Sequence, residues 1–221
     1  MKEFNSVKIW SDAREFTISN AGILFPVYAA AAVFNGLAAG PWWLAPVAFV
    51  VEIIAAMALI LAVAGLLDGR APSAREAYNA AFQYALPGLW LSLLKILFLV
   101  PLFLCLLVPG VIFHVFWSFA LAAVALRGKK GIAALKYSYA LVSDNWGPVF
   151  QLQLLFFMIF LPFGIVLLLL MNVFGLPNTS PLVVGVNMVF SALVMPWYYS
   201  AMVFAMRALE EIKEQDSPKA V

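Results

Sequence analysis

Long apolar runs follow one another along this chain, and their length constrains the fold more than any other feature. Residues 44–67 and 146–173 are two such runs, and they contain almost no charged side chain. A helix of about 20 apolar residues is long enough to cross the hydrocarbon core of a bilayer. Because 65% of the residues are hydrophobic and only 11% are charged, the composition lies outside the range of soluble domains. The sequence therefore predicts an all-α integral membrane protein.

The pattern predicts six transmembrane helices within a single domain of residues 1–221, with no room for a soluble domain. The expected spans are 18–37, 44–67, 87–108, 111–126, 146–173 and 181–206. A Pro109-Gly110 turn is expected between the third and fourth spans. The charged segment 207–221 is expected to be a tail that ends disordered.

Positive charges are segregated along the chain. Of the 13 Lys and Arg residues, all except Lys95 lie in the N-terminal segment, the second or fourth loop, or the C-terminal tail. The positive-inside rule then predicts a multi-pass protein of a bacterial or archaeal inner membrane, with both termini in the cytoplasm. The first apolar run also has the character of a signal peptide, but Asp12 and Glu15 precede it, so we expect it to remain as the first span.

Each pair of spans is preceded by an amphipathic segment. These segments are 1–17, 72–85 and 132–142. Their apolar residues recur every three or four positions, which is typical of helices lying in the membrane plane. Prolines recur at intervals of 61 residues, at Pro26, Pro87 and Pro148. The spacing predicts three repeats of an in-plane helix plus a helical hairpin, with chance placement of prolines near helix starts as the alternative.

Two formally charged residues lie within the predicted spans. Glu52 is near the middle of the second span and Lys95 is within the third. A charged residue at this depth costs roughly 3 kcal/mol on insertion scales, so each is expected to be neutral, paired or functional. A Glu52–Lys95 pair is one alternative, provided that the second and third spans are neighbours. A hydrogen-bonded structural role for Glu52 and a snorkelling Lys95 are the others.

Two further groups of polar residues are candidates for binding sites. Ser92, Gln151 and Gln153 lie near the predicted cytoplasmic ends of the third and fifth spans. They are expected to line a polar pocket or to make hydrogen bonds between helices. The basic turn formed by Arg127, Lys129 and Lys130 is the expected contact for anionic lipid or an anionic partner.

Catalytic motifs are absent from the sequence. It contains no phosphate-binding glycine-rich loop, HExxH or GxSxG motif. The single cysteine, Cys105, and the single histidine, His114, do not provide a metal-binding cluster. We therefore expect no enzymatic activity, no cofactor, no metal and no nucleic-acid partner.

Residues 109–149 resemble a known membrane domain. The segment joins a Pro-Gly turn, an aromatic-rich span, a basic turn, an Ala-Leu-Lys-x-Ser-x-x-Leu stretch at 134–141 and Asn145-Trp146. In these features it looks like the membrane domain found with bacterial and archaeal glycerophosphodiester phosphodiesterases and in their stand-alone relatives of unknown function. The resemblance implies a six-span helical domain. It does not imply phosphodiester hydrolysis, because the soluble catalytic domain of those enzymes is missing from this sequence.

Two functions follow as expectations. The first is a non-catalytic membrane protein that binds lipid, especially anionic lipid, or another membrane protein or a second copy, in envelope organisation or as an accessory subunit. The second is a small transporter or channel with a path around Glu52 and Lys95. A hydrated cavity at these residues favours transport, whereas packing against helices or lipid favours the first function.

Overall fold

The computed structural model describes residues 4–37 and 42–216, and every regular element in these ranges is a helix. The predicted all-α fold is confirmed for this part of the chain. The predicted turn after the first span and the end of the tail fall partly outside it. The elements are α1 (Ser6–Ser19), α2 (Ala21–Leu37), the short 3-10 helix η1 (Trp42–Leu44), α3 (Ala45–Leu67), α4 (Ala74–Phe82), α5 (Ala85–Cys105), α6 (Leu107–Phe116), α7 (Ala120–Arg127), α8 (Ile132–Val142), η2 (Ser143–Asn145), α9 (Trp146–Phe174) and α10 (Pro181–Asp216).

A shorter helix followed by two longer helical segments occurs three times along the chain. The shorter helices are α1, α4 and α8, and the pairs that follow them are α2 with α3, α5 with α6 and α7, and α9 with α10. This is the element order predicted from the proline spacing.

Among the described residues, five helical segments are long and apolar enough to cross a bilayer, and a sixth is counted if α1 and α2 form one bent span. The chain turns by 91° between these two helices. Asn20 is at the turn, where its backbone N–H and its side-chain amide both donate to the carbonyl of Phe16, at 3.0 and 2.8 Å. The apolar helix therefore begins at Ala21 rather than at residue 18, because Asn20 ends α1.

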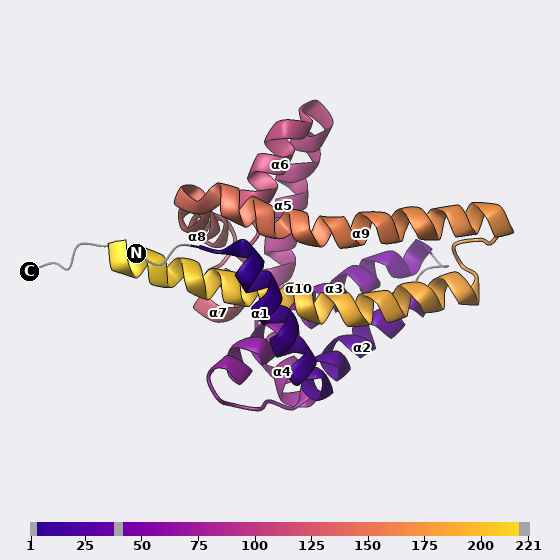
Figure 1. The fold of residues 1–221 in the computed structure, drawn as a ribbon, viewed down its shortest axis with the longest axis horizontal. Coiled ribbons are helices and arrows are strands. Elements are labelled where there is room, and N and C mark those ends of the chain that lie inside the picture. The colour runs from indigo at the N-terminus through magenta and orange to yellow at the C-terminus, as the bar shows by residue number, and fades with distance from the viewer. Residues whose placement is uncertain (1–3, 38–41, 217–221) are drawn as a thin grey trace, which may run out of the picture.

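Helix α3 lies at the centre of the packing and contacts α2, α4, α5, α7 and α10. Its alanines at 55, 58 and 62 are completely buried, and small residues allow helix backbones to approach closely. Figure 1 shows α9 running alongside α10, whereas the hairpin of α5 and α6 extends away from them.

The hairpin turn lies earlier than expected. Leu106 is the extended residue between α5 and α6, while Pro109 and Gly110 belong to the first turn of α6. Proline is tolerated there because the first N–H groups of a helix need no intrahelical acceptor. A Cβ on Gly110 would lie 2.5 Å from the ring of Phe103. Glycine therefore permits the close approach of α6 to α5.

The predicted fourth span falls within one candidate membrane span, 107–127, but a turn at residues 117–119 interrupts its helical hydrogen bonding between α6 and α7. Ser138 of α8, which is fully buried, donates from its hydroxyl to the carbonyl of Phe116 at 2.7 Å and accepts from the N–H of Phe119 at 3.1 Å. The Nε1–H of Trp146 donates to the carbonyl of Ile112 at 3.3 Å. Side chains from the α8–α9 region thus satisfy backbone groups in an apolar helix, which is the condition for a break inside a membrane.

The final helix continues beyond the expected end of its span. Residues 207–216 are helical, and Leu209 among them is completely buried. Three side chains on successive turns make ion pairs with three other elements. These pairs are Arg207 with Asp68 at 2.8 Å, Glu210 with Arg127 at 2.5 Å and Lys213 with Asp144 at 2.9 Å. Residues 207–216 of the expected tail are therefore helical, packed and ion-paired, whereas its expected disordered end, 217–221, lies outside the described residues. We call this region, with the turns after α3 and α7, the charged end.

Candidate functional site

Glu52 lies in the second turn of α3 and is bound by two neutral donors from α2. The hydroxyl of Tyr28 donates to one carboxylate oxygen at 2.7 Å, and the side-chain amide of Asn35 donates to the other at 2.7 Å. The donors are seven residues apart, so they lie on the same face of α2. Hydrogen bonds of this kind hold the carboxylate in one orientation and stabilise its charged form.

The carboxylate faces a cavity of about 350 Å³ between α2, α3 and α10. Polar groups of Asn178, Asn187 and Ser191 line the side formed by α10 and the loop before it. The remaining lining residues are mostly apolar or small: Ala32, Gly36, Val183, Val184, Met188 and Met195. One ionisable group with a few amide and hydroxyl groups in an apolar cavity is the usual composition of a small-molecule site.

The close approach of α2 to α10 shapes this cavity. A Cβ on Gly36 would clash with the side chain of Met188 and lie 3.1 Å from Val184. Glycine at this position therefore brings the two helices together beside the cavity. Helix α4 also contacts α2, because the hydroxyl of Tyr78 donates to the carbonyl of Val27 at 2.6 Å. Burial, with a smaller contribution from the negative charge of Glu52, raises the pKa of Tyr78.

Lys95 does not share this cavity. The predicted adjacency of the second and third spans is confirmed, since Gly88 at the start of α5 lies against Met57 and Ile53 of α3. Lys95 is nevertheless two turns further along α5, and the ion pairs found in the described residues do not include one with Glu52. The structure pairs Glu52 with Tyr28 and Asn35 instead.

The predicted polar pocket is not assembled as one site. Gln151 and Gln153 are both on α9, and the amide oxygen of Gln151 accepts a hydrogen bond from Ser6 of α1 at 2.5 Å. Ser92 is on α5, which packs mainly against α3, α6 and α7. The nitrogen of Gln153 is buried without a hydrogen-bond partner in the described residues. Gln151 thus makes the hydrogen bond between helices that was the alternative role.

The basic turn is partly neutralised by the rest of the protein. Arg127 makes two hydrogen bonds with the carboxylate of Glu210, which also accepts from the hydroxyl of Tyr137. The ammonium of Lys129 lies 6.0 Å from the centre of the Tyr137 ring, within the range of a cation–π interaction. Lys129 and Lys130 are exposed, so they keep the charge that an anionic partner would need.

Sequence reasoning identified Glu52 but missed the residues around it. Tyr28 and Asn35 are seven residues apart in α2, and Asn187 and Ser191 are four apart in α10. Polar residues with these spacings share a helix face, so their pattern was a usable signal. No group of three or more His, Cys, Asp or Glu side chains in the described residues is arranged to hold a metal ion.

No family model, curated protein or solved structure matches this chain. The resemblance of residues 109–149 to the phosphodiesterase-associated membrane domain therefore stays a prediction.

Proposed function

We propose that this polytopic membrane protein binds a small organic cation, such as a protonated amine, in the cavity beside Glu52. The observation that carries the proposal is the Glu52 carboxylate, held by Tyr28 and Asn35 at 2.7 Å and facing about 350 Å³ of space. A negative charge within a membrane-spanning helix is costly. A bound cation would offset that cost.

The walls of the cavity favour an organic cation over a bare ion. Met188, Met195 and Val184 give an apolar surface that would contact alkyl groups, and methionine adapts its shape to such groups. Asn187 and Ser191 provide acceptor oxygens for the N–H groups of an amine. Site volumes of roughly 300 Å³ or more are typical of small-molecule ligands.

A binding experiment with alkylammonium salts tests this proposal. Purified protein is titrated with ethylammonium and tetraethylammonium chloride, and the midpoint of thermal unfolding is followed with sodium chloride as the ionic-strength control. Ligands that bind only the folded state raise its stability. We expect Glu52→Gln to weaken the response about tenfold or more, because it removes the charge while retaining the shape. Glu15→Gln, an exposed change in α1, is the matched control.

Equal responses of the wild type and Glu52→Gln would contradict the proposal. Tyr28→Phe and Asn35→Leu separate binding from folding, because each removes one donor and keeps the carboxylate. If these variants unfold at lower temperature yet still respond to ammonium ions, the two donors stabilise the fold and Glu52 alone attracts the ligand.

Transport is the natural extension of cation binding at this position. Flux of a radiolabelled alkylammonium ion into proteoliposomes, compared between the wild type and Glu52→Gln, distinguishes a transporter from a binding protein. In this proposal the protein is not an enzyme, and the segregated charges support an inner-membrane location with both termini in the cytoplasm.

Binding of lipid or of a partner protein is the second candidate function. The exposed Lys129 and Lys130 support it at the basic turn, where anionic lipids contribute about 1 kcal/mol per cation near the surface. Replacing both lysines by glutamine is expected to weaken binding to vesicles rich in phosphatidylglycerol. Unchanged binding would contradict this role for the turn.

A further inference from the structure

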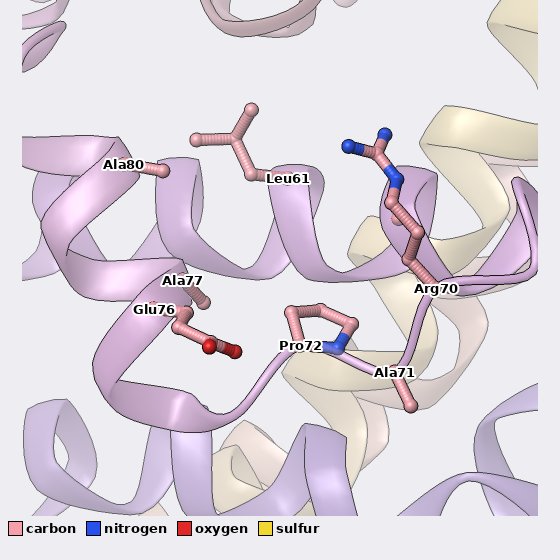
Figure 2. Close-up of a pocket in the computed structure, with 8 residues that line it drawn as sticks. Leu61, Arg70, Ala71, Pro72, Glu76, Ala77 and Ala80 are labelled. Atoms are coloured by element: carbon pink, nitrogen blue, oxygen red, sulfur yellow. The ribbon is translucent and has the colours of Figure 1, made fainter.

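A second pocket, separate from the Glu52 cavity, lies at the charged end between the last turns of α3 and the start of α4. Its volume is about 420 Å³. Figure 2 shows Arg70 and Glu76 on different sides of it, with Pro72 of the connecting loop between them. The apolar lining consists of Leu61, Gly65, Ala71, Pro72, Ala77 and Ala80. The pocket thus presents one positive group, one negative group and an apolar surface.

Arg70 keeps hydrogen-bonding capacity for a ligand. Its guanidinium lies 3.2 Å from Asp68, but the same carboxylate also pairs with Arg207 at 2.8 Å. Two guanidinium groups therefore share the carboxylate of Asp68. Because a guanidinium has five N–H donors, Arg70 has donors left for a ligand. The side chain of Arg70 is 75% exposed. It has both the charge and the access needed to bind a phosphate.

Glu76 is held in place and charged. One carboxylate oxygen accepts from the backbone N–H of Ser73 at 2.8 Å, while the hydroxyl of Ser73 accepts from the N–H of Glu76 at 3.3 Å. This capping box begins α4. The hydrogen bond from the Ser73 backbone lowers the pKa of Glu76, so the carboxylate is negative at neutral pH.

The position of the pocket along α3 predicts that it lies at the depth of lipid headgroups. α3 is apolar up to Leu67, and Arg70 follows within one turn's length of chain. Charged side chains just after an apolar span are expected at the bilayer interface. Leu61 and Ala80, further from the charged turn, lie on the side that would meet acyl chains.

We propose that this pocket binds the headgroup of a phospholipid carrying both a phosphate and a primary ammonium group, as in phosphatidylethanolamine. Arg70 binds the phosphate and Glu76 accepts hydrogen bonds from the ammonium group. The apolar lining contacts the glycerol and the first part of an acyl chain. A headgroup with opposite charges matches the pocket better than a purely anionic headgroup, which would face the carboxylate of Glu76.

The test measures lipid binding to the full chain by native mass spectrometry from detergent micelles. Micelles contain phosphatidylethanolamine, phosphatidylcholine or phosphatidylglycerol with identical acyl chains. We expect phosphatidylethanolamine to bind best, because the quaternary ammonium of phosphatidylcholine has no N–H to donate and phosphatidylglycerol has no ammonium group. Arg70→Gln and Glu76→Gln are each expected to reduce its binding about tenfold.

Matched controls separate this site from folding and from general charge attraction. Glu76→Gln retains the capping box, because glutamine also accepts a hydrogen bond at this position. Circular dichroism checks that Arg70→Gln and Glu76→Gln stay folded. Arg75→Gln removes a nearby exposed charge outside the pocket and is expected to leave binding unchanged. Glu52→Gln is expected to leave it unchanged as well, which makes the result independent of the cation proposal.

Three results would overturn the proposal. Phosphatidylglycerol binding as well as phosphatidylethanolamine would indicate simple attraction of anions. An equal loss with Arg75→Gln would show that the pocket is not the site. Soluble phosphoethanolamine competing at the same concentration as the lipid would identify a free zwitterion as the ligand.

Discussion

Helices α3 and α9 are almost equally hydrophobic, yet the protein surrounds one and leaves the other open. In the most apolar window of each, 61% of the residues of α3 are buried, against 6% for the segment that contains α9. The difference follows from side-chain size. α3 carries alanines and a glycine over its second half, whereas α9 carries leucine and phenylalanine. Small residues favour contact between helices, and large apolar residues suit lipid equally well.

Helix α5 of the α5–α6 hairpin is, like α9, mostly exposed on the protein surface. Only 11% of the window in α5 is buried, and Leu97 and Leu104 are 64% and 81% exposed. Hydropathy thus predicts which segments enter the membrane, and the distribution of small residues predicts which of them form the protein core.

The largest effect is expected from filling the core of α3. Ala58 is completely buried, so Ala58→Leu should lower the free energy of unfolding by about 1–3 kcal/mol through overpacking. Leu169→Ala in α9 should change it by less than about 0.5 kcal/mol, because this side chain is 57% exposed. Unfolding in mixed micelles measures both. A similar loss in the two variants would show that α9 has a protein partner.

A smaller effect is expected at the break between α6 and α7, where the hairpin joins the core. Ser138→Ala removes the partner of the Phe116 carbonyl and the Phe119 N–H, which should cost about 1–2 kcal/mol for buried unpaired groups. Ser143→Ala is the control, since this hydroxyl is exposed. Equal stability of the two variants would mean that the break does not depend on Ser138.

Gly164 and Gly36 allow the same substitution, Gly→Ala, to be compared on an open helix surface and in a close contact between two helices. Gly164 in α9 has open space where a Cβ would lie, so Gly164→Ala should stabilise the protein by about 0.5–1 kcal/mol through helix propensity. In Gly36→Ala the new Cβ would lie against Met188 and Val184. We therefore expect this variant not to be stabilised. Thermal unfolding of both variants checks the sign, and stabilisation by Gly36→Ala would contradict tight packing of α2 on α10.

The smallest effect concerns pH at the charged end. The hydrogen bond from Arg207 lowers the pKa of Asp68, so this carboxylate stabilises the folded state above its unfolded pKa. The contribution is lost as the pH falls through the lower folded pKa. Asp68→Asn should flatten the acid side of a stability profile by a small amount, because the pair is exposed. An unchanged profile would show that the ion pair contributes nothing.

Sequence patterns predicted the helices well and the site only in part. The bounds of α8 agree with the predicted 132–142, because the basic turn before it contains Gly128 and Gly131, whose positive φ angles mark a local break in the helix. Glu52 was found because a charge in an apolar run is conspicuous. The cavity around it depends on α2 meeting α10, which lies some 150 residues away along the chain, and no local pattern encodes that contact. Counting charges likewise did not reveal that Glu210 neutralises Arg127.

The unequal lengths of the apolar helices have a consequence for the surrounding bilayer. α9 has 29 residues and α2 has 17, which correspond to about 44 and about 26 Å. A hydrocarbon core of about 30 Å is therefore too thin for an upright α9 and slightly too thick for α2. If α2 crosses the bilayer without a contribution from α1, the lipids beside it are expected to thin, whereas α9 is expected to tilt or to thicken the lipids around it. The protein is thus expected to impose a gradient of membrane thickness across its own width.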